Sequence, residues 1–136
     1  MLEESIDGDE VECAVLGNDE PIASVVGEIV PVNDFYDYDA KYADGTTRLY
    51  IPARISEKKS AEIRRQAVRV FKALDCAGFS RVDFFIRHTD GAVLLNEINT
   101  IPGFTSISMY PKLFEASGIP YAELTDRLLS LALEKR

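Results

Sequence analysis

A strand that ends in metal-ligand chemistry constrains how the rest of this chain can fold. Val93 opens an apolar run that leads into Glu97 and Asn99 and then into the turn residues Pro102 and Gly103. Side chains alternate across a strand, so counting by two places four of them on one face: Val93, Leu95, Glu97 and Asn99. We therefore expect Glu97 and Asn99 to point the same way where the strand ends.

The charge of the chain argues against a nucleic-acid partner. Among 136 residues, 23 Asp and Glu outnumber 15 Lys and Arg, and the formal net charge is −8. Nucleic-acid binding depends on Lys and Arg that neutralise backbone phosphates. A local basic pocket for one small anion remains compatible with this balance. The remaining composition, 46% hydrophobic and 28% charged, is that of an ordinary globular domain.

The cysteines and the N-terminal residues indicate a reducing compartment. Cys13 and Cys76 lie far apart, and neither belongs to a Cys-x-x-Cys or Cys/His pattern, so we expect two buried, reduced thiols. The first residues do not combine a basic segment with an apolar one, and no apolar run approaches the ~18 residues that a membrane span needs. We therefore expect a cytoplasmic protein with no membrane partner.

Turn residues divide the chain into predicted strands and one long loop. Apolar and alternating patterns predict strands at 11–16, 22–32, 48–51, 81–88 and 92–99. Residues 33–46 mix aromatic and charged residues without a period, which predicts a loop. The loop either carries chemistry or uses its aromatic residues only to hold itself against the core.

Three helices are predicted between and after these strands. Ser56 is placed to cap the first, which Gly78 ends. Its apolar positions recur at helical spacing: Ile63, Ala67, Val70, Phe71 and Leu74. Pro111 opens a short helix that Gly118 stops, and a longer one begins near Tyr121. We expect an α+β fold in which an antiparallel sheet has helices packed on one face.

The loop of the last predicted hairpin decides whether its polar side chains meet. A three-residue loop from Thr89 to Gly91, with Gly91 in the left-handed bulge position, is our favoured interpretation. It pairs His88 with Ala92, Asp83 with Glu97, and Arg81 with Asn99. A two-residue loop would pair Phe84 with Glu97 and send Asp83 and Glu97 to opposite faces. A site at this place requires the longer loop.

In the favoured register two carboxylates face each other across ~4.5 to 5.5 Å, which is repulsive without a cation between them. Oxygen ligands from Asp83, Glu97 and Asn99, without His or Cys, suit Mg²⁺ or Mn²⁺. The alternative is a solvated face that Arg81 and Arg87 neutralise. Spacing alone does not choose between these two interpretations.

The segment after Asn99 is rich in small residues and has two interpretations. The backbone N–H groups and hydroxyls of residues 100–108 are suited to hold an anion, although such a segment also serves as a turn before a helix. Neither G-x-G-x-x-G nor G-x-x-x-x-G-K-[ST] occurs, so a Rossmann or P-loop nucleotide site is unsupported. His88, at the hairpin tip, is expected to be a surface residue.

Three motifs in colinear order resemble the C-terminal part of D-alanine-D-alanine ligases, which are ATP-grasp enzymes. They are Tyr38–Tyr42, Arg81–Asp83 and Asn96–Thr105, and the resemblance runs from about Glu3 to the C-terminus. In that family ATP phosphorylates the carboxylate of one D-alanine, and the amine of a second D-alanine attacks the acyl phosphate. The product, D-alanyl-D-alanine, serves peptidoglycan synthesis.

The resemblance implies a phosphate site at the end of the hairpin. Asp83, Glu97 and Asn99 would hold two Mg²⁺ or Mn²⁺ ions that bridge the ATP phosphates, with Glu97 shared between them. Arg81 would stabilise the transferring phosphoryl group. The Gly103 N–H would face the oxyanion of the tetrahedral intermediate.

The resemblance also implies contacts to the second substrate and to the nucleotide. Ser108 and Lys41 would bind the carboxylate of the second D-alanine. The related vancomycin-resistance ligases that make D-alanine-D-lactate lack the Lys41-Tyr42 pair, which favours D-alanine here. Residues expected at the nucleotide are Glu3, Glu4 and Ile6 at the adenine edge, Glu10 on the ribose hydroxyls, and Phe35 in the loop that closes over ATP. The family often has Lys where Glu4 stands, so only a backbone contact is expected there.

The family implies a division of residues 1–136, all within the C-terminal ATP-grasp region. Residues 1–32 would form the hinge strand and the end of the central domain, 33–47 the mobile loop over ATP, and 48–136 the C-terminal catalytic region. We expect the N-terminal domain of such ligases to be absent, the fragment to be inactive alone, and the full-length protein to be a homodimer. The alternatives are another ATP-grasp carboxylate-amine ligase and a non-catalytic ATP/Mg-binding module.

Overall fold

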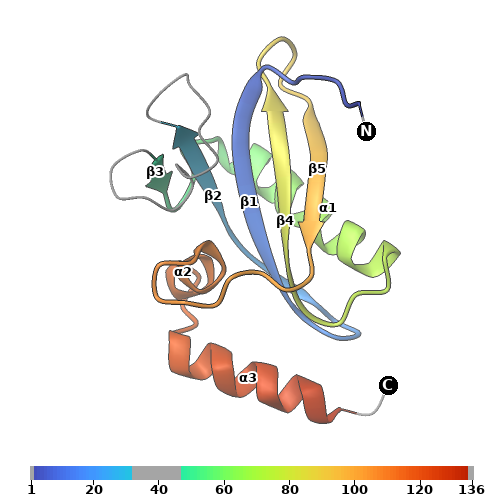
Figure 1. Cartoon of the computed structure of the whole chain (residues 1–136), viewed down its shortest axis with the longest axis vertical. Coiled ribbons are helices and arrows are strands. Elements are labelled where there is room, and N and C mark those ends of the chain that lie inside the picture. The colour runs from blue at the N-terminus through green and yellow to red at the C-terminus, as the bar shows by residue number, and fades with distance from the viewer. Residues whose placement is uncertain (1, 32–46, 135–136) are drawn as a thin grey trace.

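The computed structural model describes residues 2–31 and 47–134, and its centre is a five-stranded sheet in the order β3-β2-β1-β4-β5 (Figure 1). The strands are β1 (Gly8–Gly17), β2 (Ile22–Pro31), β3 (Thr47–Tyr50), β4 (Gly78–Arg87) and β5 (Val93–Asn99). Each neighbouring pair is antiparallel. The α+β class and the antiparallel sheet are therefore confirmed.

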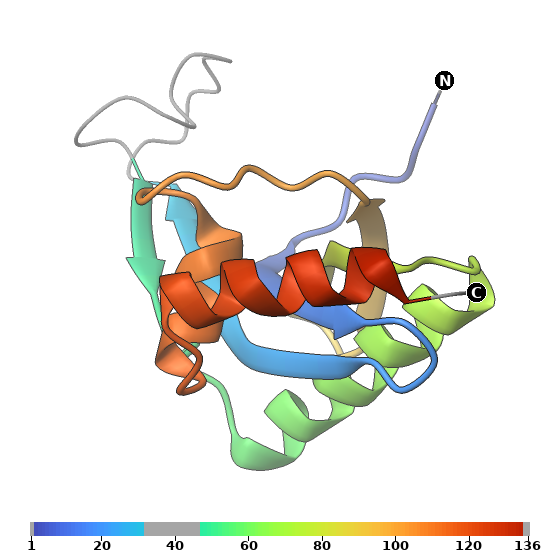
Figure 2. The same cartoon turned by 90° about the horizontal axis from the view of Figure 1, so that it is seen from below.

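Helices cover both faces of this sheet, so the prediction of helices on one face is wrong. They are α1 (Glu57–Ala73), α2 (Met109–Ala116) and α3 (Tyr121–Leu133). In β1, Cys13 and Val15 pack with α1, whereas Ala14 and Leu16 pack with α2 and α3. Because alternate side chains of a strand point to opposite faces, the helices lie in two layers. Figures 1 and 2 show α1 on one side of the sheet and the α2–α3 pair on the other.

The first helix ends earlier than its apolar pattern predicts. It begins at the predicted cap, because the Ser56 Oγ accepts the Lys59 N–H at 3.2 Å. It ends at Ala73, however, and Leu74 is 58% exposed and not a core residue. The chain leaves the helix at Asp75, whose φ is +52°, and Gly78 opens β4 instead of ending α1.

The aromatic side chains around α2 fasten that helix to the sheet. The Tyr110 hydroxyl donates to the Val15 carbonyl at 3.1 Å, and its ring contacts those of Phe79, Phe104 and Phe114. A Cβ on Gly27 of β2 would lie 2.6 Å from Met109 Cε, so a larger residue there would displace the end of that side chain. The helix begins at Met109, two residues before the predicted Pro111. A proline in the first turn costs no helical hydrogen bond.

The β4–β5 hairpin reaches the predicted pairing by a different route. Arg81 pairs with Asn99 and Asp83 with Glu97, which confirms the predicted partners. Near the turn, the Arg87 N–H donates to the Ala92 carbonyl at 2.9 Å, so the predicted pairing of His88 with Ala92 is wrong. Residues 88–91 therefore form the loop, and Gly91 has a φ of +68°. A bulge at Asn96 then shifts the register by one residue and restores the Asp83–Glu97 pair.

This bulge also changes which residues of β5 share a face. Val93 pairs with Ile86 and packs in the cluster around α1. Glu97 pairs with Asp83 beyond the bulge, on the opposite face. The prediction that Val93 and Glu97 share a face is thus wrong, because one extra residue inverts the alternation. Glu97 and Asn99 do share a face, since both lie beyond the bulge.

Two further predictions concern the thiols and membrane spans. Cys13 and Cys76 are both free cysteines, and burial raises the pKa of the Cys13 thiol to about 12. Cys76 is only partly buried, which corrects the prediction for that residue. Among the helices of residues 2–31 and 47–134, none is long and apolar enough to cross a membrane.

Candidate active site

Three acidic residues lie side by side across three neighbouring strands. Glu12 of β1 pairs with Asp83 of β4, and Asp83 pairs with Glu97 of β5. We call these three the acidic row. It lies on the face of the sheet that carries α2, because Ala14 and Leu16 share the parity of Glu12 and pack in the α2 cluster. The row is buried at Glu12 and Asp83 and exposed at Glu97, so a ligand can reach it from the β5 edge.

Arg81 supplies the positive charge beside the acidic row. Its Nε and Nη2 donate to Oδ1 and Oδ2 of Asp83, both at 2.8 Å. Its Nε also lies 3.2 Å from Oε2 of Glu12. The exposed fractions of the three side chains are 15% for Arg81, 3% for Glu12 and 2% for Asp83. A bidentate, charge-assisted pair in so dry a place is a strong one.

This burial does not fit the alternative of a solvated face that two arginines neutralise. Arg87 is engaged elsewhere, because its Nε and Nη2 donate to Asp90 at 3.0 and 2.7 Å in the hairpin loop. The hydrogen bond from Arg87 lowers the pKa of Asp90 to about 2. The acidic row therefore has Arg81 beside it, and Arg87 stabilises the turn.

Glu12 is the residue of this site that sequence reasoning missed. It lies in a predicted strand between Val11 and Cys13, and its place beside Asp83 depends on β1 pairing with β4. β1 ends at residue 17 and β4 begins only at residue 78, so no local pattern reveals their pairing. The signal that could have found it was a carboxylate in the middle of an otherwise apolar strand, because a buried charge requires a partner.

Glu10 lies on the same face as Glu12, one pair further along the strand. It is half-buried and pairs with Ile29 on one side and with Phe85 on the other. Phe85 pairs in turn with Leu94. A row of apolar residues with one carboxylate thus adjoins the acidic row, and such a surface suits a ligand with an apolar ring and hydroxyl groups.

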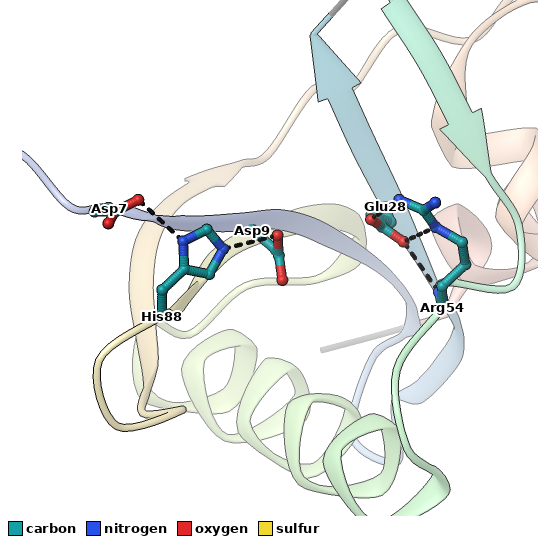
Figure 3. A network of polar contacts seen from close by, with 5 residues as sticks. All are labelled: Asp7, Asp9, Glu28, Arg54 and His88. Atoms are coloured by element: carbon teal, nitrogen blue, oxygen red, sulfur yellow. Dashed lines mark hydrogen bonds and ion pairs between the residues drawn. The ribbon is translucent and has the colours of Figure 1, made fainter.

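The residues predicted at the adenine edge precede β1 in an extended segment. Glu3 and Glu4 are exposed and Ile6 is half-buried. The segment is tied to the hairpin loop, because the His88 N–H donates to the Asp7 carbonyl at 3.0 Å. The imidazole of His88 also lies between the carboxylates of Asp7 and Asp9, at 3.0 Å from each (Figure 3). His88 is an exposed residue, as predicted.

The segment after β5 forms a compact turn that brings Gly103 and Ser108 together. The Asn99 Oδ1 accepts the Ile101 N–H at 3.0 Å. Ser108 is the N-cap residue of α2, and its Oγ accepts the Thr105 N–H at 3.1 Å. A Cβ on Gly103 would lie 3.0 Å from that same Oγ, so the exposed Gly103 backbone packs directly on Ser108.

The donors near β5 are of the kind that a hard divalent cation prefers. Asp83, Glu97 and Asn99 offer only oxygen, from adjacent strands and toward one face. The described residues contain no group of three His, Cys, Asp or Glu placed to hold an ion, and this set consists of two carboxylates and an amide. Mg²⁺ commonly completes such a set with water and phosphate oxygens. Both Asp83 oxygens are engaged by Arg81, so an ion would have to compete with that guanidinium.

Three predicted site residues lie outside the described ranges. They are Phe35, Lys41 and Tyr42. Their predicted roles stay predictions.

The chain resembles known proteins over nearly its whole length. A family model described as D-ala D-ala ligase C-terminus matches residues 1–130. The D-alanine--D-alanine ligase of Acetivibrio thermocellus is 58% identical over 99% of this chain and 36% of that protein. The chain thus spans about a third of the length of this relative.

Solved structures share the fold. The VanG D-Ala:D-Ser ligase from Enterococcus faecalis has a TM-score of 0.84 and 45% identity, with 96% of this chain and 38% of that chain covered. The D-alanine--D-alanine ligase from Bacillus anthracis, in complex with ATP, has a TM-score of 0.77 and 30% identity, over 96% of this chain and 41% of that chain.

Proposed function

The chain belongs to the D-alanine-D-alanine ligase family, whose C-terminal region it matches, and we propose that it supplies the metal- and phosphate-binding part of an enzyme that joins two D-alanine molecules. One observation carries the proposal above all. Asp83 and Glu97 are paired on adjacent strands, with Arg81 bound to Asp83 and Asn99 opposite Arg81. The arrangement unites oxygen donors for a divalent cation with a cation for phosphate.

The proposed reaction transfers the terminal phosphoryl group of ATP to a D-alanine carboxylate. Such a transfer depends mainly on positioning and on neutralising the charge of the phosphates. Asp83, Glu97 and Asn99 would hold two Mg²⁺ or Mn²⁺ ions, which supply that neutralisation when bound. Arg81 binds the transferring group through its guanidinium, which matches phosphate oxygens in a bidentate way.

The second half of the reaction is attack of the second D-alanine amine on the acyl phosphate, followed by loss of phosphate. Gly103 donates its backbone N–H to the oxyanion of the tetrahedral intermediate, as an oxyanion hole does. Ser108 binds the carboxylate of the incoming D-alanine together with Lys41. The contact between the Gly103 backbone and Ser108 supports these roles, because it brings both groups to one place.

The nucleotide lies along the same face of the sheet in this proposal. Glu10 accepts the ribose hydroxyls, and the backbone near Glu3, Glu4 and Ile6 binds the adenine edge. Phe35 closes over the nucleotide and helps to exclude water from the acyl phosphate. The row of Glu10 beside Ile29, Phe85 and Leu94 supports this orientation, because it places an apolar surface next to the acidic row.

We assign D-alanine as the second substrate because of the Lys41-Tyr42 pair. A ligase that contains this chain is expected to make the dipeptide in excess over the depsipeptide at neutral pH. Competition between D-alanine and D-lactate, with product quantified by mass spectrometry, measures this. D-Serine belongs in the same competition, because one structural neighbour is a D-Ala:D-Ser ligase. An excess of depsipeptide or of the D-serine product would contradict the assignment.

A hybrid enzyme tests the proposed function. The C-terminal 36% of the A. thermocellus ligase, which matches this chain at 58% identity, is replaced by residues 1–136. We expect phosphate release that requires ATP, a divalent cation and D-alanine together. Omission of each component is the control for unspecific ATP hydrolysis. A folded hybrid that releases no phosphate with D-alanine, or prefers another amino acid from a panel, would refute the proposal.

A further inference from the structure

Glu12 is a buried charged residue to which the proposed reaction gives no role. Only 2% of its surface is exposed, although it lies in the middle of β1. A carboxylate is not kept in so dry a place without compensation by a positive group. Nε of Arg81 lies 3.2 Å from its Oε2. Glu12 therefore lies against Arg81, the residue proposed to bind the transferring phosphoryl group.

Arg81 contacts two carboxylates, those of Asp83 and Glu12, in different ways. Asp83 accepts hydrogen bonds from Nε and Nη2, and the Oε2 of Glu12 lies 3.2 Å from Nε. In the proposed function Asp83 is also a ligand of the divalent ions. An Asp83 carboxylate that turns to an ion gives up at least part of its bidentate contact with Arg81. Glu12 is not among the proposed ion ligands, so its carboxylate stays beside the guanidinium, 3.2 Å from Nε.

We propose that Glu12 is a positioning residue that holds the Arg81 guanidinium in the site while Asp83 binds the ions. This inference rests on the proposed function and deepens it. Glu12 reaches the guanidinium from the neighbouring strand β1, so it stays in place when Asp83 changes partner. In this proposal Nε faces Glu12 while the terminal nitrogens of Arg81 bind phosphate oxygens, and the side chain needs no rearrangement when the phosphoryl group is transferred.

A purely structural role is the rival explanation, and the chain contains a matched control for it. Glu28 is also a buried glutamate, 5% exposed, bound to Arg54 through Nη2 at 2.6 Å and Nε at 3.0 Å (Figure 3). It pairs with Val11, which packs against α1, so Glu28 belongs to the face opposite the acidic row. Glu28→Gln and Glu12→Gln are thus the same change at two buried glutamates that each lie beside an arginine, and only one of them adjoins the site. The arginines differ in exposure, which is 55% for the Arg54 side chain and 15% for that of Arg81.

The first test follows Arg81 itself and needs no catalysis. The Nε–H signal of Arg81 is observed by ¹⁵N-edited NMR in the full chain and assigned by its loss in Arg81→Lys. Asp83→Asn weakens the contact of residue 83 with Arg81, as an ion bound to Asp83 would. We expect the Arg81 signal to stay slow in solvent exchange in Asp83→Asn, and to exchange roughly tenfold faster or more when Glu12→Gln is added. Equal exchange in the single and double variants would overturn the proposal. Circular dichroism verifies that both are folded.

The second test uses kinetics in the hybrid ligase and does not depend on an Asp83 variant. Glu12→Gln is expected to lower kcat by about 10- to 100-fold with both KM values within about threefold, since it disturbs a contact made in the transition state. In an Arg81→Lys background the same change is expected to add less than about threefold, because Glu12 acts through Arg81. Glu28→Gln is expected to lower Tm and leave kcat unchanged.

The outcomes separate the inference from the proposed function. A Glu12→Gln hybrid with the kcat of the active wild-type hybrid would overturn the inference alone. So would an effect of Glu12→Gln that is as large in the Arg81→Lys background as in the wild-type background, or a Glu28→Gln variant that loses as much kcat. A folded wild-type hybrid without D-alanine-dependent phosphate release would contradict the proposed function itself, and with it the role assigned to Arg81.

Discussion

Asp83 shows at the scale of one residue how this chain keeps a charged group inside. Its surface is 1% exposed, and it lies between Glu12 and Glu97 on the neighbouring strands. Arg81 compensates the charge of this buried carboxylate through two hydrogen bonds, one to each of its oxygens. In the proposed function, a divalent ion and Arg81 would compete for the same two oxygens of Asp83.

Removing a single ligand charge tests the proposed metal site directly. Glu97→Gln and Asp83→Asn in the hybrid ligase are each expected to lower kcat by roughly 10²-fold or more, since each removes charge that holds the ions at the phosphates. Steady-state phosphate release measures this. Glu97 is exposed, so Glu97→Gln is expected to leave Tm within about 1 °C, in keeping with the small effects of surface substitutions. Near-normal turnover in a well-folded variant would refute the assignment.

At the scale of the elements, the β4–β5 hairpin combines two local irregularities that compensate each other. The loop of residues 88–91 is one residue longer than predicted, and the bulge at Asn96 shifts the register back by one. Without the bulge, the pairing that begins next to the loop would continue along the hairpin, and Asp83 would not lie opposite Glu97. The candidate site therefore depends on the bulge in β5, a strand whose alternating sequence pattern predicts no irregularity.

The segment before β1 is expected to be held more firmly at low pH. Hydrogen bonds to Asp9 and then to Asp7 raise the pKa of His88 above its ordinary value. A raised pKa in the folded state means that the protonated form stabilises the contact. The contribution is fully present below the unfolded pKa of about 6.5 and is lost as pH rises through the higher folded pKa. All three side chains are solvent-exposed, so screening keeps the effect modest.

Hydrogen exchange of the His88 amide measures this effect, because that N–H donates to the Asp7 carbonyl at 3.0 Å. After correction for the intrinsic pH dependence of exchange, its protection is expected to be higher at pH 5.5 than at pH 8.5. His88→Gln is the control, since its side chain does not titrate and its protection should not depend on pH. Equal protection at both pH values in the wild-type chain would contradict the role of the imidazole.

The close approach of α2 to β2 predicts a cost for any side chain at Gly27. A Cβ there would lie 2.6 Å from Met109 Cε and 2.8 Å from Leu113 Cδ2. Both atoms are ends of flexible side chains, so Gly27→Ala is expected to displace them and to destabilise the chain by about 1 kcal/mol, at the low end for overpacking, as measured by urea denaturation. In a Met109→Ala background the added methyl has room, so its cost should shrink. Additive costs in the double variant would show that Met109 is not the obstacle.

At the scale of the whole molecule, the acidic row joins three strands that are distant in sequence. β1 lies at the centre of the sheet, and β4 and β5 pair successively beside it. The buried end of the row is at β1, and the exposed end is at the outer strand β5. In the proposed function, a nucleotide with its ions would therefore meet Glu97 first and Asp83 behind it, with Arg81 bound to Asp83.

Binding of the nucleotide is expected to stabilise the whole chain. A ligand at about 100 times its Kd adds roughly 2.7 kcal/mol to the free energy of unfolding, which is a rise of several degrees in Tm. Thermal unfolding with Mg²⁺ and ATP together should show this rise, and either component alone should give less. Glu97→Gln is expected to abolish most of the shift. The same shift in Glu97→Gln as in the wild-type chain would contradict ion-bridged binding.

The sequence by itself determined the local chemistry of this protein. Period-two alternation placed Glu97 and Asn99 on one face, and both lie beyond the bulge, so the irregularity did not affect their relation. Ser56 was identifiable as a helix cap because capping depends on neighbours within three residues. The pairing of Asp83 with Glu97 was predicted from a three-residue loop, and the structure reaches the same pair through a longer loop and a bulge.

Only the tertiary structure decided what depends on distant parts of the chain. Helices occupy both faces of the sheet because the residues of β1 from Val11 to Leu16 present apolar side chains on both faces, except at Glu12. The local sequence pattern does not show which residue is the partner of Glu12. The contact of Glu12 with Arg81 arises because β1 pairs with β4, although β2, β3 and α1 lie between these two strands in the sequence. The physical reason is that strand pairing satisfies backbone hydrogen bonds and core packing globally, whereas sequence periodicity reports only which residues share a face.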